Sequence, residues 1–314
     1  MLAIALGALA LIRNPSTWVT LTVAGLAMGL LIFLMSSGLT LVFGLMDVMN
    51  FAHGLFIAVG AYVAASTIKV FATAAGSESF LANLSAIVPA LTAATIVAGV
   101  LGLFFERLII RPVYGQHLKQ ILITTGGMIV GEQLIVVLWG PDLLPLARPT
   151  TFRGSFLIED MAIEKFRLIA VVIGLAVFAA MMVLLNRTRI GLLIRAGVEN
   201  KEMVEAMGYR IRRLFVAVFA AGSALAGLGG ALWGMYQESV QVHIGASMMV
   251  LIFIVIIIGG LGSVGGCFAG AILVGLVANY VGYLSPKIAL GSNILLMVIV
   301  LLWRPQGLYP VSRS

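Results

Sequence analysis

The chain is divided into long runs of residues that carry no formal charge, and these runs limit the folds open to it. Five runs contain no Asp, Glu, Lys or Arg at all: 79–105, 168–186, 214–237, 239–286 and 288–303. Residues 14–68 contain only Asp47, and residues 120–141 contain only Glu132. A helix that spans a bilayer needs roughly 20 predominantly apolar residues, so most of these runs are long enough for one crossing or more.

The overall composition agrees with these runs. Only 10% of the 314 residues are charged and 61% are hydrophobic, whereas a soluble domain has about 25% charged residues. An ordinary water-soluble enzyme, a disordered chain and a DNA-binding domain are therefore excluded. We expect an all-α, polytopic membrane protein of about eight to ten transmembrane helices, in one transmembrane domain over residues 1–314. The expected spans are 18–43, 51–69, 83–105, 120–140, 168–186, 214–237, 246–284 in two passes, and 288–303.

Residues 1–12 form a further short apolar segment. A secretory signal peptide places its positive charge before the apolar part, whereas here Arg13 follows it. We therefore expect this segment to be retained.

The basic residues predict how the chain is oriented in the membrane. They crowd residues 106–119, 187–213 and the C-terminus, whereas residues 141–167 balance four basic against four acidic side chains. Cytoplasmic loops carry an excess of Lys and Arg. We therefore expect a cytoplasmic loop at about 187–213, an external loop at about 141–167, and a cytoplasmic C-terminus.

The sequence predicts no metal site and no nucleotide site. Cys267 is the single cysteine, and the three histidines are scattered, so no ligand cluster can be recognised from spacing. The phosphate-binding pattern G-x-x-x-x-G-K-[ST] is absent. We expect no cofactor bound by this chain, and energy supplied by a partner or an ion gradient.

Two glycine-rich elements of similar sequence separate apolar runs. Residues 44–54 and 260–270 match at four positions, including Gly44 with Gly260. Asp47 corresponds to Ser263, and both residue types are good helix N-caps. One interpretation is a pair of Gly-broken helices along a transport pathway, in either parallel or inverted repeats. The other is a pair of tight turns at the membrane surface.

Small residues recur every four positions in two stretches. They are Gly222, Ala226, Gly230 and Gly234, followed by Gly262, Gly266 and Gly270. Such stripes allow helices to approach closely in lipid, so we expect helix packing here rather than a pore lining.

Four polar residues lie within or beside the apolar runs. A carboxylate inside the bilayer costs roughly 3 kcal/mol or more and is a functional candidate by default, which applies to Asp47 and Glu132. Asp47 could instead cap a helix after Gly44, and Glu132 could hydrogen-bond a neighbouring helix. His53 follows Asn50 by three residues and could line the same break, either as a buried structural histidine or as a ligand contact.

The loop at 187–213 contains a predicted amphipathic helix over residues 196–207. Its sequence lacks proline, and Gly208 follows as a C-cap. Met203 and Met207 share one face, while Glu199, Glu202 and Glu205 follow a different face. Such a helix could lie across a protein partner's groove or rest on lipid. The acidic residues favour a protein partner.

Several segments together resemble the permeases of ABC importers of the branched-chain amino-acid type, the shorter of the two permeases in such systems. They are residues 38–54, Glu106-Arg107 with Arg111-Pro112, and residues 187–208, 259–266 and 304–308. The resemblance extends over about residues 18–308. Glu205, Ala206 and Gly208 would occupy an element like the E-A-A…G coupling motif, although Gly208 follows sooner here and no Leu-Pro comes after it.

The resemblance implies a permease subunit that is not itself an enzyme, in the inner membrane of a bacterium. It implies four kinds of contact: a second related permease, two cytoplasmic ATPases that use ATP, a periplasmic substrate-binding protein, and the lipid bilayer. Gly44, Asp47, Asn50, His53, Glu132, Gly260 and Ser263 are then the candidate pathway residues. Glu199, Glu202, Met203, Glu205, Ala206, Met207 and Gly208 are the candidate coupling residues. Nucleic acid is not an expected partner.

Alternatives remain open from the sequence. Related permeases serve urea and short amides. An ion-coupled secondary transporter would use Asp47 or Glu132 as coupling carboxylates and would need no docking helix. A membrane enzyme would need polar groups convergent at one depth, and the sequence offers no such set.

Overall fold

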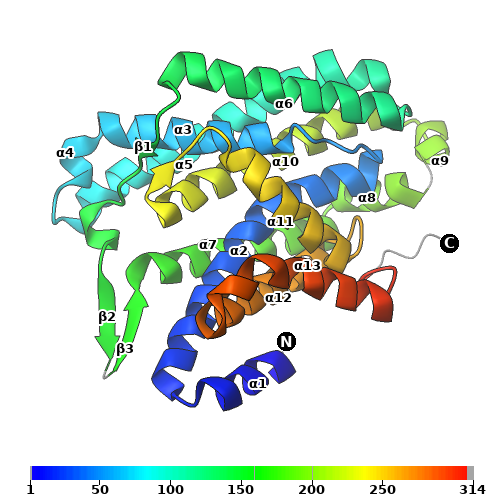
Figure 1. Ribbon diagram of the computed structural model, residues 1–314. Coiled ribbons are helices and arrows are strands. Elements are labelled where there is room, and N and C mark those ends of the chain that lie inside the picture. Colours follow the sequence, from blue (N-terminus) through cyan, green and yellow to red (C-terminus); the bar gives the residue numbers. More distant parts are fainter. Residues whose placement is uncertain (1, 159, 200, 310–314) are drawn as a thin grey trace.

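The structure is a computed structural model that describes residues 2–158, 160–199 and 201–309. The described part is a bundle of α-helices with two small two-stranded sheets (Figure 1). The α-helices are α1 (Leu2–Ile12), α2 (Pro15–Met46), α3 (His53–Val70), α4 (Ala72–Ala75), α5 (Phe80–Phe105), α6 (His117–Trp139), α7 (Lys165–Arg187), α8 (Arg189–Glu199), α9 (Lys201–Ala206), α10 (Ile211–Gln237), α11 (Ile244–Gly259), α12 (Val264–Leu284) and α13 (Pro286–Trp303). The strands are β1 (Leu144–Pro145), β2 (Ser155–Ile158), β3 (Met161–Glu164) and β4 (Ser239–Val240).

The all-α membrane fold predicted from the sequence is confirmed, and every expected span is a helix. Within the described residues, seven helices are long and apolar enough to cross a membrane: α2, α3, α5 with its continuation, α6, α7, α10 and α12. α11 and the part of α13 from residue 291 are shorter apolar helices. After α5 the chain continues as a π-helix, η1 (Glu106–Ile110), and a 3-10 helix, η2 (Arg111–Val113), which lengthens that span to Phe80–Val113.

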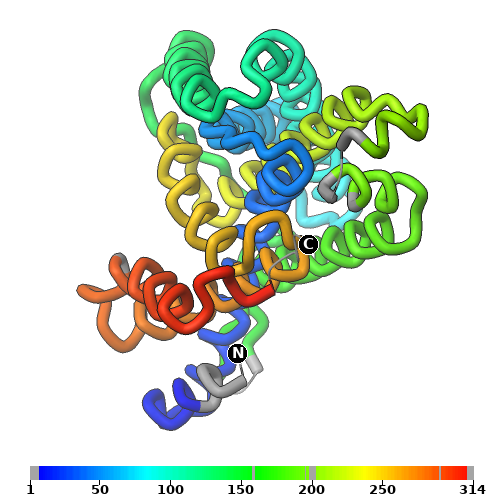
Figure 2. Tube along the Cα trace, turned by 90° about the vertical axis from the view of Figure 1, so that its right-hand side faces the viewer, coloured from blue at the N-terminus to red at the C-terminus, as the bar shows by residue number. Residues whose placement is uncertain are grey.

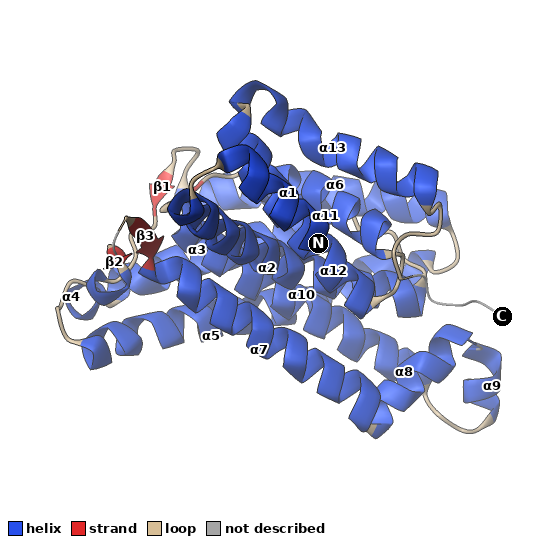
Figure 3. Ribbon diagram, turned by 90° about the horizontal axis from the view of Figure 1, so that it is seen from below, coloured by secondary structure: helices blue, strands red, loops and turns tan. Residues whose placement is uncertain are grey.

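The loops gather at two opposite ends of the bundle (Figures 1 and 3). One end, which we call the basic end, holds η2, α8, α9 and the segment after α13. The other, the hairpin end, holds the antiparallel pair β2–β3 and the pair β1–β4, which ties the loop after α6 to the C-terminus of α10. The two segments expected on one side, 106–119 and 187–213, therefore lie at the same end.

α2 lies in the middle of the bundle (Figure 2), and 78% of its most apolar window is buried. It packs antiparallel on α12, and backbone meets backbone where a Cβ on Gly29 would lie 2.7 Å from the carbonyl oxygen of Ala271. On its other side a Cβ on Gly222 of α10 would lie 2.7 Å from the Gly38 oxygen. Ala226, on the same stripe of α10, is fully buried. The small-residue stripe therefore packs helices closely, as the sequence predicted.

The predicted break at Gly44 is wrong. α2 continues through Gly44 to Met46, and Asp47 ends the helix in the left-handed conformation (φ 53°) with its N–H donating to the Phe43 oxygen. Asp47 is thus a C-cap instead of an N-cap, a conformation that Asp tolerates through local hydrogen bonding. Gly44 serves close packing, since a Cβ there would lie 2.9 Å from the Cα of Gly262.

The predicted break at Gly260 is confirmed. Gly260 has φ 101°, a region that side chains with a Cβ rarely adopt, and it ends α11. Ser263 then caps α12 by accepting a hydrogen bond from the Gly266 N–H at 3.1 Å. The two glycine-rich elements therefore differ locally, and the repeat itself stays a prediction.

Candidate functional site

Two short helices begin part-way along the bundle and run in opposite directions. The His53 Nε2 lies 2.8 Å from the carbonyl oxygen of Met35, which is eleven residues before the end of α2, or about 16 Å along it. α3 starts at this depth and runs to the hairpin end, whereas α11 runs to the basic end. Their first turns touch, since a Cβ on Gly54 would lie 2.9 Å from the backbone of Gly245. We call this contact, with the facing part of α6, the central crossing.

The non-helical segment 47–52 leads from the end of α2 back into the bundle. Its Phe51 N–H donates to the Thr124 hydroxyl of α6 at 3.2 Å. The side chain of Asn50 is 1% exposed, and neither of its amide atoms has a hydrogen-bond partner among the described residues. An unpaired buried amide costs free energy, so Asn50 is a group that a ligand or water could satisfy.

Glu132 of α6 closes the crossing from the other side. Its Oε2 lies 3.1 Å from the Nδ1 of His243, the residue that precedes α11, so the two side chains share a hydrogen bond. The Glu132 side chain is only 11% exposed, while that of His243 is 72% exposed. The Glu132 Oε1 is buried without a described partner. The expectation that Glu132 bonds a neighbouring helix is therefore confirmed, and one of its oxygens is left over.

The sequence predictions did not include His243, because it precedes the expected span that begins at residue 246. A usable signal existed, since His243 stands at the start of the longest run without any charge, 239–286, and Glu132 has no basic residue within its own run. A contact between these two isolated groups could have been predicted only if their depths in the membrane were known.

The remaining predicted pathway residues lie at the basic end. Asp47 faces His117, with a carboxylate-to-imidazole distance of 3.9 Å, and both side chains are about half exposed. Gly260 and Ser263 adjoin the segment after α13, where the Leu308 N–H donates to the Ile258 oxygen at 2.8 Å. Asn50 and His53 thus lie at the start of α3, and Glu132 faces the residue before α11. The structure separates these three residues from Gly44, Asp47, Gly260 and Ser263.

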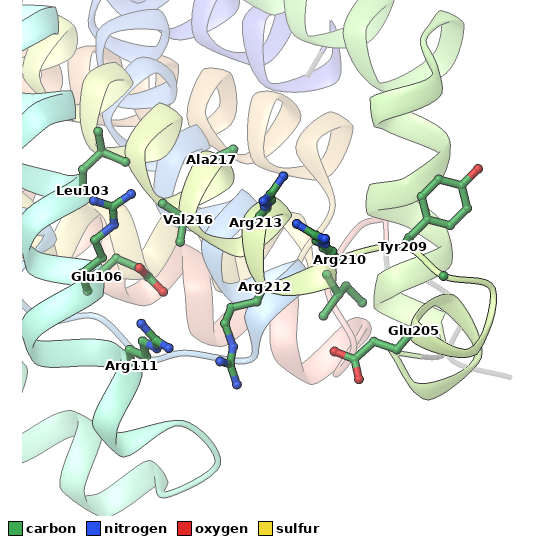
Figure 4. Close-up of a pocket in the computed structure, with 13 residues that line it drawn as sticks. Leu103, Glu106, Arg111, Glu205, Tyr209, Arg210, Arg212, Arg213, Val216 and Ala217 are labelled. Carbon is green, nitrogen blue, oxygen red and sulfur yellow. The ribbon is translucent and has the colours of Figure 1, made fainter.

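A pocket of about 880 Å³ opens at the basic end between α5 with η1 and the start of α10 (Figure 4). Five arginines line it, together with two carboxylates: Arg107, Arg111, Arg210, Arg212, Arg213, Glu106 and Glu205. Leu103, Val216 and Ala217 form its apolar part.

Glu106 is fully buried beside this pocket and belongs to the π-helix η1. The Tyr114 hydroxyl donates to the Glu106 Oε1 at 2.5 Å, whereas Oε2 has no described partner. Burial raises the pKa of Tyr114 well above its usual value, and the hydrogen bond to Glu106 and that carboxylate's charge raise it further. The charges of Arg111 and Arg212 act in the opposite sense. Tyr114 therefore stays protonated and holds the buried carboxylate.

The candidate coupling segment projects from the basic end. Most of the segment predicted as a helix over 196–207 is helical, since α8 covers Arg189–Glu199 and α9 covers Lys201–Ala206. The C-cap is correct, since Gly208 has φ 87° and its N–H donates to the Glu205 oxygen. Residue 200 and the side chains of Glu199 and Glu202 lie outside the described part.

The apolar residues of α9 divide between two sides. Val204 is buried (4% exposed) against the bundle, whereas Met203 and Met207 are 64% and 69% exposed. Glu205 and Ala206 are exposed as well. Two large apolar side chains thus remain on the outer side of the segment. Among the described residues, no group of three or more His, Cys, Asp or Glu is placed to hold a metal ion.

Comparison with known proteins gives a family match over most of the chain. Residues 21–303 match the family described as "Branched-chain amino acid transport system / permease component". The chain is 29% identical to the high-affinity branched-chain amino acid transport system permease protein BraD of Pseudomonas aeruginosa, over 91% of this chain and 94% of that protein.

Two further relatives come from one organism, Methanocaldococcus jannaschii. The probable branched-chain amino acid transport permease protein LivH is 26% identical, over 90% of this chain and 89% of that protein. The protein of the same description named LivM is 23% identical, over 89% of this chain and 90% of that protein.

Proposed function

The chain belongs to the family of branched-chain amino acid transport permeases, and from this we propose that it is a membrane-spanning subunit of an ATP-driven importer of branched-chain or related amino acids. The match over residues 21–303 is the observation that carries the proposal. Members of this family are transport components, so the chain contributes a path across the membrane and partner subunits hydrolyse ATP. We expect the chain itself to bind no cofactor.

The proposed partners begin with a second permease. The chain is similar to both LivH and LivM of one organism, which supports a pair of related but distinct permeases. α11 offers a face for such a pairing, because exposed residues recur along it at His243, Ala246, Ser247 and Val250. That face borders the central crossing, so substrate would pass between the two permeases beside Glu132.

The central crossing suits a zwitterionic amino acid. The N-termini of α3 and α11 meet there, and a helix N-terminus favours a carboxylate. The unpaired Oε1 of Glu132 could accept a hydrogen bond from an ammonium group, and Asn50 offers both a donor and an acceptor. We propose these groups as a transient site along the pathway.

Two ATPase subunits would dock on the α8–α9 segment. The exposed side chains of Met203 and Met207 give the contact its apolar part, and ATP-driven closure would move the segment with the start of α10. With the ATPases docked there, the basic end would face the cytoplasm and the hairpin end would face the outside. A periplasmic binding protein would then deliver substrate at the hairpin end.

Sidedness has a direct test because Cys267, the single cysteine, is fully buried. Gln116→Cys at the basic end and Ser155→Cys on β2 place a thiol at exposed positions. An impermeant thiol reagent should label only Ser155→Cys from the outside of intact cells. Labelling of Gln116→Cys alone would reverse the orientation.

An ion-coupled secondary transporter is the less favoured alternative. Asp47 lies half exposed at the basic end, which is a poor place for a coupling carboxylate inside the membrane. Of the two carboxylates considered for ion coupling, Asp47 and Glu132, the buried Glu132 keeps that possibility. A urea or short-amide importer would use the same machine, so the substrate must be measured.

The deciding experiment is uptake by proteoliposomes that contain the chain with its partner permease, ATPases and binding protein. Labelled leucine should enter only with ATP present, and the chain alone should transport nothing under a proton or sodium gradient. Glu132→Gln should lower uptake, while Glu78→Gln, an exposed carboxylate at the hairpin end, should not. Gradient-driven uptake by the chain alone would support the secondary transporter, and uptake of urea in place of leucine would change the substrate.

A further inference from the structure

The pocket at the basic end, beside the coupling segment, is lined by arginines from two sides. Its five guanidinium groups come from two walls. Arg107 belongs to η1 and Arg111 to η2, which continue α5, whereas Arg210, Arg212 and Arg213 lie at the start of α10. Arg111 and Arg212 point into the same opening (Figure 4), and the charges of both act on the Tyr114 hydroxyl. Basic groups from both walls therefore converge on one small volume.

The five arginines of the pocket are not neutralised by ion pairs with carboxylates of the described residues. None of the five arginines forms an ion pair within 4.0 Å with a carboxylate in the described ranges, although Glu106 and Glu205 also line the pocket. The five arginines outnumber the two carboxylates, so the pocket carries excess positive charge. Convergent guanidinium groups with no partner fit an anion with several acceptor oxygens.

The deeper wall of the pocket is apolar because it is built from spanning helices. α5 and α10 touch where a Cβ on Gly102 would meet the side chain of Ser223. Immediately towards the basic end they leave the space lined by Leu103, Val216 and Ala217. All three residues belong to segments long and apolar enough to cross a membrane. A ligand here would therefore meet arginines at one end and hydrocarbon at the other.

The apolar part continues along the outer surface of the same two helices. On α5, Val100 and Phe104 are 45% and 59% exposed. On α10, Ala217 and Ala221 are exposed and small. An acyl chain could lie between these rows and bury their apolar surface.

We propose that this pocket binds the headgroup of an anionic phospholipid, whose phosphate meets Arg111 and Arg212 while its acyl chains follow α5 and α10. Basic pockets between spanning helices recognise such headgroups by charge complementarity. The bound lipid would connect the end of α5 to the first turn of α10, next to α9. The inference depends on the pocket alone and stands whichever substrate the importer carries.

The test compares two double variants of equal charge. Arg111→Gln/Arg212→Gln removes one arginine from each wall, and Arg187→Gln/Arg189→Gln removes two exposed arginines at the basic end outside the pocket. The full chain, purified and delipidated, is titrated with phosphatidylglycerol or with phosphatidylcholine of the same acyl chains, and lipid retention is measured by native mass spectrometry. Each pocket arginine should contribute about fivefold in affinity, so the pocket variant should bind phosphatidylglycerol about 25-fold more weakly than the control variant.

Phosphatidylcholine should bind weakly to all forms. Arg111→Lys/Arg212→Lys keeps the charges and should regain most of the phosphatidylglycerol binding, which a merely structural role would not produce. Equal phosphatidylglycerol affinity in the pocket and control variants would overturn the proposal.

Two further arms separate the sources of the same chemistry. Glycerol phosphate, which lacks acyl chains, should not compete at millimolar concentration, and full competition would identify a soluble anion as the ligand. Phosphatidylglycerol should also remain bound when the complete complex with its ATPases is measured. Its displacement there would assign the pocket to a protein partner and reject the lipid.

Discussion

The contact between the first turns of α3 and α11 makes Gly245→Ala a decisive substitution. Gly245 is the second residue of α11, and a Cβ there would lie inside van der Waals contact of the Gly54 oxygen and 2.5 Å from its carbonyl carbon. Carbon atoms pack at about 3.5–4.0 Å, so the two helix starts must separate by roughly 1 Å. Overpacking of this kind costs about 1–3 kcal/mol, offset by about 1 kcal/mol because Ala favours a helix interior over Gly.

The matched control is Gly265→Ala. Gly265 is the second residue of α12, and no heavy atom lies within 4 Å of a Cβ placed there. Helix propensity then acts alone, so this variant should be as stable as the parent or up to about 1 kcal/mol more stable. The difference between the two variants in thermal unfolding measures the cost of separating the helices.

The separation should affect transport more than stability. His243 is two residues before Gly245, and its distance of 3.1 Å to Glu132 would lengthen beyond hydrogen-bond reach. We expect leucine uptake by the reconstituted complex to fall at least tenfold, with normal assembly and membrane abundance. Equal stability and equal uptake in Gly245→Ala and Gly265→Ala would refute the argument that the crossing is a tight, functional contact.

Four other substitutions have defined outcomes. Met203→Asp or Met207→Asp should place a charge in the proposed ATPase contact, and a buried, unpaired charge costs several kcal/mol. ATPase co-purification should therefore be lost while membrane abundance is unchanged. If the ATPase is retained, α9 is not part of the contact. Gly260→Val should cost about 1–3 kcal/mol of backbone strain, seen as a lower unfolding temperature, and an unshifted temperature would contradict the strained conformation. Tyr114→Phe should cost about 1–3 kcal/mol of stability by leaving Glu106 unpartnered. The raised pKa of Tyr114 stabilises the fold below pH ~10, and this gain is lost as the pH rises above that value. The parent and the variant should therefore converge in stability in strong alkali, and a difference that stays constant with pH would refute this.

The spans could be predicted because each depends on a property of a continuous stretch of sequence. Absence of charge over about 20 residues is independent of what packs against the helix. The break at Gly260 was also local, since positive φ and the Ser263 cap lie within four residues. The Gly44 element resembles the Gly260 element at four positions, but its first glycine has a different role. Gly44 is small because Gly262 lies against it, and a glycine needed for packing cannot be distinguished from one needed for a turn without knowing its neighbour.

The functional groups were harder to predict because their pairing depends on depth. Glu132 and His243 are 111 residues apart and meet only because α11 starts part-way along the bundle. Asn50 and His53 are also distant from Asp47 in depth, although these residues are close in sequence. The non-helical segment 47–52 carries the chain from the basic end to the crossing.

The short length of α11 links the two candidate regions mechanically. Its 16 residues extend about 24 Å, from the central crossing to Gly259, where the Tyr309 N–H donates to the Gly259 oxygen. A displacement at the basic end is therefore delivered along one continuous helix to Gly245. At that point the contact with Gly54 is backbone against backbone, without interlocking side chains that would resist sliding. Because α11 starts at the crossing, a shift of its first turn would change the distance between His243 and Glu132.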